Sequence, residues 1–150
     1  MANTSAAGSS SSTPNNAPRQ IFLFLLAADV IVLMVYLLVI PGGFAPDYLR
    51  RNEAVLRLVG SMAEQGKVVA AVCHGPWVLC STQALKGRRA TCFHSIKDDV
   101  VNAGASYTDA EVVRDGNLIT SRKPDDLPAF MQAVLQAVRE ARPALAGTAR

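Results

Sequence analysis

Apolar residues fall along this chain in two patterns, short unbroken runs and runs with helical spacing. Unbroken runs rich in β-branched residues are typical of strands that are buried on both faces of a parallel sheet. By this criterion the sequence predicts strands at about Leu33–Ile40, Val68–Val72 and Arg89–Phe93. The pair Asp115-Gly116 is a turn signal, and it predicts a hairpin between Glu111–Arg114 and Asn117–Thr120.

Helical spacing predicts four helices between and after these strands. Asn52 is a suitable N-cap for the first, which ends at Gly66. The others are predicted at Trp77–Leu85, from a capping box at Ser95–Asp98 to Gly104, and after the capping residues Asp125/Asp126, with Leu127, Phe130, Val134, Leu135 and Val138 on one face. The alternation predicts an α/β fold, a parallel sheet sandwiched by helices.

The stretch Ile21–Ile40 admits two interpretations. It holds 20 residues with one charge, Asp29, which is the length and hydropathy of a membrane span. A central charge opposes insertion by about 2.5–3.5 kcal/mol. The other interpretation is two buried strands, Ile21–Leu26 and about Leu33–Ile40, although the link between them is too short for an ordinary parallel crossover. We therefore expect a disordered tail at 1–20, a single domain at 21–140 with an atypical apolar segment at 21–36, and a frayed tail at 141–150.

Composition and charge narrow the possible partners and cofactors. The 15 basic and 12 acidic residues give a net charge of +3, and the basic pairs are scattered without interleaved aromatic residues. This disfavours a nucleic-acid surface. The three cysteines are an odd number without CxxC spacing, which is typical of free thiols in a reducing compartment, so we expect a cytoplasmic protein. The histidines and cysteines lack metal-ligand spacing, and we expect no metal and no cofactor.

The turn after Val68–Val72 carries the candidate chemistry. The apolar run stops at Cys73-His74-Gly75-Pro76, and a helix-compatible run follows at once. Such a turn places its residue at the carboxyl end of a sheet, where α/β proteins build sites. Cys73 is therefore a candidate nucleophile, with His74 as its activating partner. Oxyanion donors are expected from the backbone N–H of His74 and from the loop at Gly42 and Gly43.

The other chemistry-bearing residues have plainer interpretations. Most lone cysteines are buried and inert, so Cys80 and Cys92 are predicted to lie in the core. His94 follows a strand end and is expected at the surface. Trp77 is expected either to pack in the core or to form the rim of a pocket.

Four segments in a fixed order resemble the ThiJ/PfpI superfamily, specifically its PfpI-type intracellular cysteine peptidase branch with a type 1 glutamine amidotransferase-like domain. They are Leu38–Arg50, Ala70–Leu79, Gly87–Ala105 and Asp115–Phe130. The resemblance implies a flavodoxin-like fold, a dimer or hexamer, and Cys73 as nucleophile beside His74. It also implies a peptide or small-molecule substrate, with peptidase, deglycase or glyoxalase-type, or chaperone-like stress activity.

The resemblance also marks one possible site residue and several departures. It implies that Asp47 reaches the cysteine–histidine pair of a neighbouring subunit; a carboxylate at a helix N-terminus is the other interpretation.

No glutamate precedes Glu53, whereas the family's N-terminal segment supplies one to the reactive cysteine. Phe93 stands where PfpI-type members often carry a tyrosine. The family's first helix and intervening strands are missing, which predicts exposed apolar surface and an incomplete N-terminal side. These departures motivate the alternative of a non-enzymatic or impaired redox protein with an oxidisable Cys73.

Overall fold

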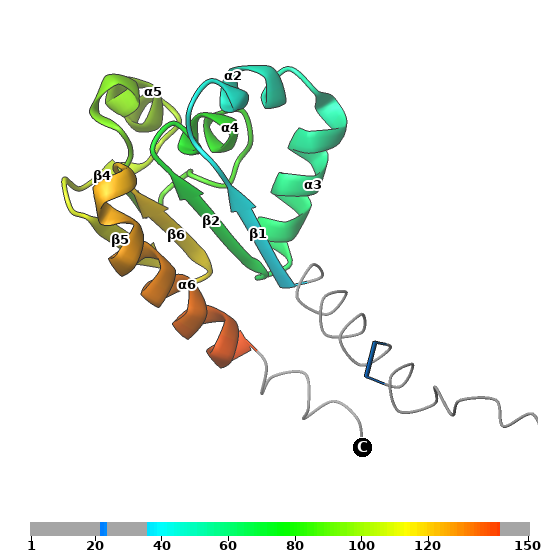
Figure 1. The fold of residues 1–150 in the computed structure, drawn as a ribbon. Helices are drawn as coiled ribbons and strands as arrows, with labels where there is room; N and C mark the ends of the chain where they lie inside the picture. The colour runs from blue at the N-terminus through cyan, green and yellow to red at the C-terminus, as the bar shows by residue number, and fades with distance from the viewer. Residues whose placement is uncertain (1–21, 24–35, 142–150) are drawn as a thin grey trace, which may run out of the picture. The chain divides into compact units, whose positions relative to one another are not determined.

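The structure, a computed structural model, describes residues 22–23 and 36–141 (Figure 1). Its centre is a four-stranded sheet in the order β1-β2-β6-β5. The strands β1, β2 and β6 are parallel, and the edge strand β5 is antiparallel to β6. Their bounds are Leu37–Ile40 for β1, Val68–Val72 for β2, Val112–Asp115 for β5 and Leu118–Ser121 for β6. The α/β prediction is confirmed, with the correction that the hairpin makes the sheet mixed.

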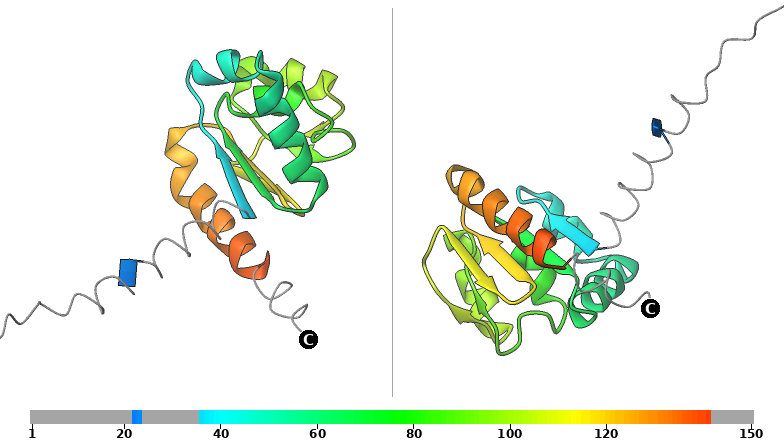
Figure 2. Two further views of the ribbon diagram at one scale, coloured as in Figure 1. Left: turned by 90° about the vertical axis from the view of Figure 1, so that its right-hand side faces the viewer. Right: turned by 90° about the horizontal axis from the view of Figure 1, so that it is seen from below.

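Helices cover both faces of this sheet (Figures 1 and 2). The helix α6 (Leu127–Ala141) packs on one face against β2, β5 and β6. On the other face lie α3 (Glu53–Glu64) and α4 (Pro76–Cys80), with α2 (Ala45–Leu49) and α5 (Lys97–Asn102) against α4. A separate short parallel pair joins β3 (Arg89–Ala90) to β4 (Ser106–Tyr107).

The central strand β2 is buried because helices lie on both sides of it. Val69 and Ala71 belong to the core beneath α3 and α4, whereas Val68 and Ala70 pack with Phe130 and other residues of α6. Side chains alternate between the two faces of a strand, so an unbroken apolar run satisfies both cores. The two cores therefore fix β2 on both faces, up to its carboxyl end at Val72, where Cys73 follows.

Several predicted ends of elements are confirmed. The Asn52 side chain accepts hydrogen bonds from the backbone N–H groups of Ala54 and Val55, at 2.9 and 3.4 Å, and so caps α3. Gly66, just beyond α3, has a φ of 72°, and Gly116 in the β5–β6 hairpin has a φ of 57°. Both are conformations that glycine adopts without steric cost.

The helix after the cysteine turn is shorter than predicted. It ends at Cys80, and turns replace the expected helix as far as Leu85. The Thr82 hydroxyl donates to the Leu79 carbonyl at 2.8 Å and accepts from the Ala84 N–H at 3.1 Å. Local side-chain bonds of this kind compete with helical backbone bonds, which explains the early end.

The strand predicted at Arg89–Phe93 is also shorter, because it ends at Ala90. Beyond it, the Thr91 N–H donates to the Thr120 hydroxyl at 2.8 Å, and the Phe93 N–H donates to the Cys73 carbonyl at 2.9 Å. These bonds hold the segment to β6 and to the cysteine turn instead of continuing a strand ladder.

The predicted capping box is wrong. A 3₁₀ turn at His94–Ile96 precedes α5, and no side chain caps that helix. The predicted end near Gly104 is confirmed by its φ of 91°.

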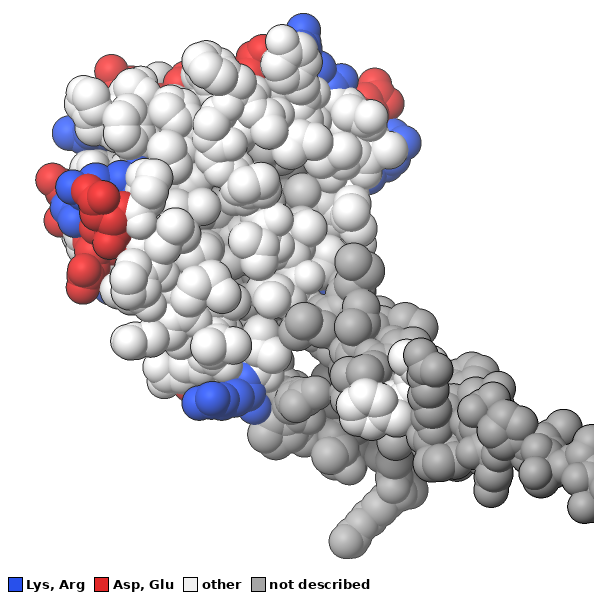
Figure 3. Space-filling view, viewed as in Figure 1, with Lys and Arg blue, Asp and Glu red and all other residues white. Residues whose placement is uncertain are grey.

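The last helix begins after a 3₁₀ turn at Pro124–Asp126. The carboxylate of Asp126 accepts from Arg122 at 3.0 and 3.3 Å, so it forms an ion pair in place of the expected cap. Phe130 and Val134 are buried as predicted, but Leu127 and Leu135 are 40% and 51% exposed. In the view of Figure 3, the surface over α6 and the strands is largely uncharged, and charged side chains gather at its rim.

Most of the atypical apolar segment lies outside the described residues, as do the tails at 1–20 and 142–150. Phe22 and Leu23 have helical backbone, which contradicts the strand expected at these two positions, and β1 begins only at Leu37. Within residues 22–23 and 36–141, no helix is long and apolar enough to cross a membrane.

Candidate active site

The cysteine turn has an unusual backbone at its first residue. Cys73 has a φ of 61°, in the left-handed region that a residue with a side chain adopts at a cost of about 1–3 kcal/mol. The Cys73 N–H donates to the Ser121 carbonyl at 3.0 Å, and the Gly75 N–H closes the turn on the Val72 carbonyl at 2.8 Å. Together with the bond from Phe93, these contacts hold the thiol at the carboxyl end of β2.

Two glycines allow the backbone to pack closely around this turn. A Cβ at Gly42 would lie 2.6 Å from the Cβ of Cys73 and 3.2 Å from its sulfur. A Cβ at Gly75 would lie 2.5 Å from the Ile40 carbonyl oxygen. The Gly42 backbone therefore lies directly against Cys73, whereas Gly43, with a φ of 71°, has open space around it.

The thiol and two further side chains form a chain of polar contacts. The sulfur of Cys73 lies 3.2 Å from Nδ1 of His74. The other ring nitrogen of His74, Nε2, lies 3.1 Å from the hydroxyl oxygen of Ser95. A histidine that contacts a thiol on one side and an orienting group on the other is the arrangement that activates nucleophiles.

Aromatic rings hold the imidazole between them. His74 stacks on Phe93 with ring centroids 4.9 Å apart, and it meets Trp77 edge-on at 5.9 Å. Trp77 is fixed in turn, because its indole N–H donates to Asp99 at 2.7 Å and the Arg50 guanidinium lies 5.3 Å from the ring centroid. These contacts restrict the rotation of the His74 ring.

A cavity of about 450 Å³ opens beside the histidine. Its lining includes His74 and Trp77 from the cysteine turn and its helix, together with Gly43, Phe44, Asp47 and Tyr48 from the loop after β1 and from α2. Trp77 is thus at the rim of a pocket, one of its two predicted positions. An aromatic hollow beside a thiol has the lining expected of a small-molecule site.

Asp47 lies in this cavity and in the first turn of α2. Its carboxylate is 3.8 Å from Arg51, and its side chain is 54% exposed. Within the described part of the chain it is paired with that arginine and not with Cys73 or His74. Its place in the first turn of α2 fits the interpretation as a carboxylate at a helix N-terminus, and its contact with a neighbouring subunit stays a prediction.

The other two cysteines lie in a different electrostatic setting. Burial raises the pKa of the Cys92 thiol to about 12 and that of the Cys80 thiol to about 11. Cys92 is 1% exposed, and Cys80 packs half-buried against the same core. The core prediction is confirmed for Cys92, whereas Cys80 lies only partly buried at the margin of the core; the surface position of His94 is confirmed. Because both pKa values are raised, neither of these thiols has the thiolate character that a nucleophile needs.

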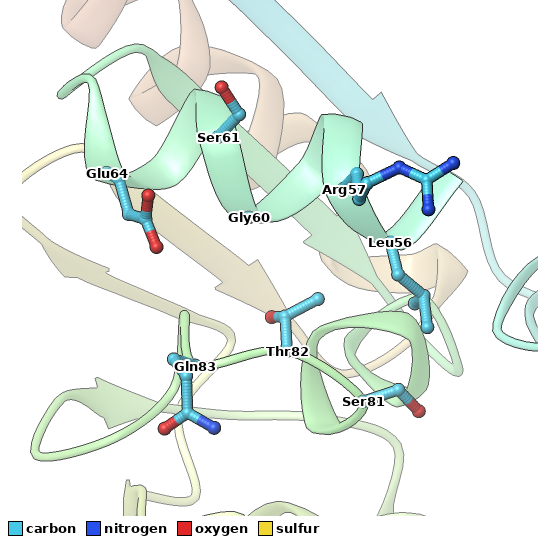
Figure 4. A pocket seen from close by; sticks show the side chains of 8 residues that line it. All are labelled: Leu56, Arg57, Gly60, Ser61, Glu64, Ser81, Thr82 and Gln83. Carbon is cyan, nitrogen blue, oxygen red and sulfur yellow. The ribbon is translucent and has the colours of Figure 1, made fainter. Parts of the chain in front are cut away.

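A second hollow, of about 500 Å³, lies between α3 and the turn after α4 (Figure 4). Its polar side chains, Arg57, Ser61 and Gln83 among them, point in different directions in Figure 4. Such a hollow brings no reactive group toward a ligand. Among the described residues, no three His, Cys, Asp or Glu side chains form a group that could hold a metal ion; the absence of a cofactor stays a prediction.

The sequence located Cys73, His74 and the Gly42-Gly43 loop, and the structure brings these together. It did not locate Ser95 or the stacking of Phe93 on His74. The spacing of Ser95 to Asp98 is typical of a helix cap, and no local signal links Ser95 to a histidine 21 positions earlier. The helix that follows Cys73, α4, has only five residues, so its dipole contributes little to activation of the thiol.

The fold and the turn define a class of protein: a flavodoxin-like α/β domain with a cysteine elbow at the carboxyl end of its central strand. Residues 25–137 match the DJ-1/PfpI family. The chain therefore belongs to the DJ-1/PfpI family.

Individual relatives agree with this assignment. Deglycase TK1284 of Thermococcus kodakarensis is 50% identical over 102 residues, which cover 68% of this chain and 61% of the relative. General stress protein 18 of Bacillus subtilis is 48% identical over 94 residues, 62% of this chain and 55% of that protein. Among solved structures, a two-domain Anabaena variabilis protein with DJ-1/ThiJ/PfpI-like and ferritin-like domains superposes with a TM-score of 0.67 at 53% identity, over 69% of this chain and 30% of that one. The chain thus spans about 61% of the length of the curated relative that it matches at 50% identity.

Proposed function

We propose that this chain carries the nucleophile of a cysteine-dependent hydrolase or lyase of the PfpI type, acting on peptides or on glycated, reactive-carbonyl substrates. The observation that carries the proposal is the contact of 3.2 Å between the Cys73 sulfur and Nδ1 of His74, at a strained elbow beside an aromatic cavity. A relative that is 50% identical is named a deglycase, which supports the carbonyl chemistry.

The proposed reaction begins when His74 takes the Cys73 proton. The thiolate then attacks a substrate carbonyl carbon, a carbon–sulfur bond forms, and the carbonyl π electrons move to oxygen. Backbone N–H groups of His74 and of the Gly42-Gly43 loop stabilise this oxyanion. On an amide, collapse expels the amine with the proton returned by His74, and water then hydrolyses the thioester.

The test uses the full chain with two substrates, an unmodified peptide and a peptide treated with a dicarbonyl, and measures released amine. Replacing Cys73→Ala removes the nucleophile, so we expect at least about 100-fold loss of release. Cys80→Ala is the matched control, and we expect it to retain activity. Release that survives in Cys73→Ala overturns the proposal, and the substrate that reacts separates peptidase from deglycase activity.

The same proposal includes a cytoplasmic homo-oligomer, a dimer or hexamer, in which Asp47 of a neighbouring copy approaches the cysteine–histidine pair. The exposure of Asp47 at the cavity supports this arrangement. Light scattering on the sample used for the activity assay gives the oligomer size, and a single-chain mass contradicts a site shared between copies.

A second candidate is a non-enzymatic stress or redox protein, and the similarity to General stress protein 18 favours it. In this case the Cys73 thiolate attacks one oxygen of hydrogen peroxide, the O–O bond breaks, and the departing hydroxide takes the proton that His74 had accepted from the thiol, so that a sulfenic acid and water form. Mass spectrometry after mild peroxide treatment tests it. The absence of an oxidised Cys73 peptide rejects this candidate, and oxidation without amine release favours it over the hydrolase.

A further inference from the structure

The hydroxyl of Ser95 is the polar side chain that contacts the outer nitrogen of His74. The two contacts of the ring are 3.2 Å from Nδ1 to the Cys73 sulfur and 3.1 Å from Nε2 to the Ser95 oxygen. The side chain of Asp47, which lines the cavity beside His74, is paired with Arg51 instead. Within the described part of this chain, Ser95 thus occupies the position of an orienting third group.

We propose that Ser95 is a positioning residue that acts on Cys73 through His74. Its hydroxyl accepts a hydrogen bond from the Nε2–H of the neutral imidazole, which leaves the Nδ1 lone pair facing the thiol. This inference rests on the proposed role of Cys73 as nucleophile, and it names the group that prepares the histidine for that role.

Ser95 acts by selecting one of the two tautomers of the neutral His74 imidazole. A neutral imidazole carries one proton, and the hydrogen bond made by one nitrogen decides which nitrogen is free to accept. With the proton on Nε2, Nδ1 can take the proton of Cys73. After that transfer the imidazolium donates from both nitrogens, to the thiolate and to the Ser95 oxygen. One proton moves from sulfur to nitrogen, and Ser95 accepts the same bond before and after.

The backbone on both sides of Ser95 is anchored. On one side, the Phe93 N–H donates to the Cys73 carbonyl at 2.9 Å, and the Phe93 ring stacks on His74. On the other side, Ile96 is 1% exposed in the core. The serine hydroxyl is therefore held relative to the elbow, although its side chain is open to solvent.

Ser95 has no competing role in the helix that follows. No side chain caps α5 or the 3₁₀ turn before it. Loss of the hydroxyl therefore removes the contact to His74 without removing a capping bond, which separates a positioning role from a structural one.

The experiment measures the pH dependence of Cys73 alkylation by iodoacetamide in the intact chain, read by mass spectrometry of the Cys73 peptide. In Ser95→Ala we expect the pH of half-maximal rate to rise by about half a unit to one unit, a three- to tenfold slower reaction near neutral pH. Ser95→Thr keeps a hydroxyl, and we expect it to restore the wild-type profile. The matched control is Ser61→Ala, an exposed serine on α3 away from the elbow.

Two results for Ser95→Ala overturn the inference. The first is an unchanged pH profile of Cys73 alkylation. The second is a fall in the pH of half-maximal rate, because the hydroxyl would then donate to Nε2 and hold the opposite tautomer. An equal shift in Ser95→Thr and Ser95→Ala, accompanied by a lowered melting temperature, shows a structural role only.

Alkylation needs no turnover, so the two proposals fail separately. A shifted profile in a chain that releases no amine supports Ser95 and rejects the hydrolase. Cys73-dependent release with an unshifted profile supports the hydrolase and rejects Ser95.

Discussion

Cys73 and Cys92 carry the same side chain in neighbouring segments, but they differ in burial, backbone conformation and polar contacts. The segments are joined by the bond from the Phe93 N–H to the Cys73 carbonyl. Cys92 is 1% exposed, and burial raises the pKa of its thiol to about 12. Cys73 is half-buried on a left-handed residue, with its sulfur 3.2 Å from an imidazole. The difference shows that backbone position, and not residue type, decides which thiol is available for chemistry.

The strongest test of this contrast is the relative alkylation rate of the two cysteines. Because burial raises the pKa of Cys92 to about 12, very little of it is thiolate at pH 7, and the thiolate is the form that iodoacetamide alkylates. We expect Cys73 to react with iodoacetamide at least about 10³-fold faster than Cys92 in the folded chain. Peptide mass spectrometry at timed intervals gives both rates. The control is the chain in urea, where the rates should converge; similar rates in the folded chain would contradict the assignment.

A smaller effect is expected from the glycine that lies against Cys73. In Gly42→Ala the new Cβ would lie 2.6 Å from the Cβ of Cys73 and 3.0 Å from the Val72 carbonyl oxygen. Overpacking of this kind costs about 1–3 kcal/mol, and displacement of the elbow should slow Cys73 alkylation about tenfold. Urea unfolding and the alkylation assay measure the two effects.

The matched control for that variant is Gly60→Ala. Gly60 lies within α3, and nothing lies within 4 Å of a Cβ there. We expect this variant to gain about 0.5–1 kcal/mol of stability with unchanged alkylation. Equal behaviour of the two variants would show that close packing at Gly42 does not position Cys73.

The smallest expected effect is a pH dependence of stability that arises from Cys92. Its folded pKa of about 12 lies above the value of about 8.5 in an unfolded chain. The folded state then holds the proton more tightly. The stability from the neutral thiol is thus complete below about pH 8.5, and it falls as the pH rises toward 12. The slope is at most about 1.4 kcal/mol per pH unit.

Urea unfolding at several pH values between about 8 and 10.5 measures this slope. We expect Cys92→Ala to be less stable overall but to have a flatter dependence on pH, because the titrating thiol is gone. Ser61→Ala serves as the control with the wild-type slope. Parallel curves for wild type and Cys92→Ala would show that the Cys92 proton is not held by burial.

Elements whose signals are local can be predicted from the amino-acid sequence. The run at Val68–Val72 predicted a buried strand, Asn52 predicted a helix start, and Asp115-Gly116 predicted a hairpin; all three are present. The turn at Cys73 and His74 also has a local signal, because an apolar run that ends at a glycine and a proline is a strong local boundary.

Features that depend on residues far apart in the chain are set by the three-dimensional packing, and the sequence pattern does not reveal them. The predicted helix to Leu85 stops at Cys80, and the predicted strand to Phe93 stops at Ala90. In the second case the bonds that end the element come from Thr120 and Cys73. The sequence spacing of Ser95 is that of a helix cap, but in the folded chain its hydroxyl contacts His74. A hydrogen bond needs only a distance of about 3 Å and a suitable angle, and neither is encoded in the spacing of two residues along the chain.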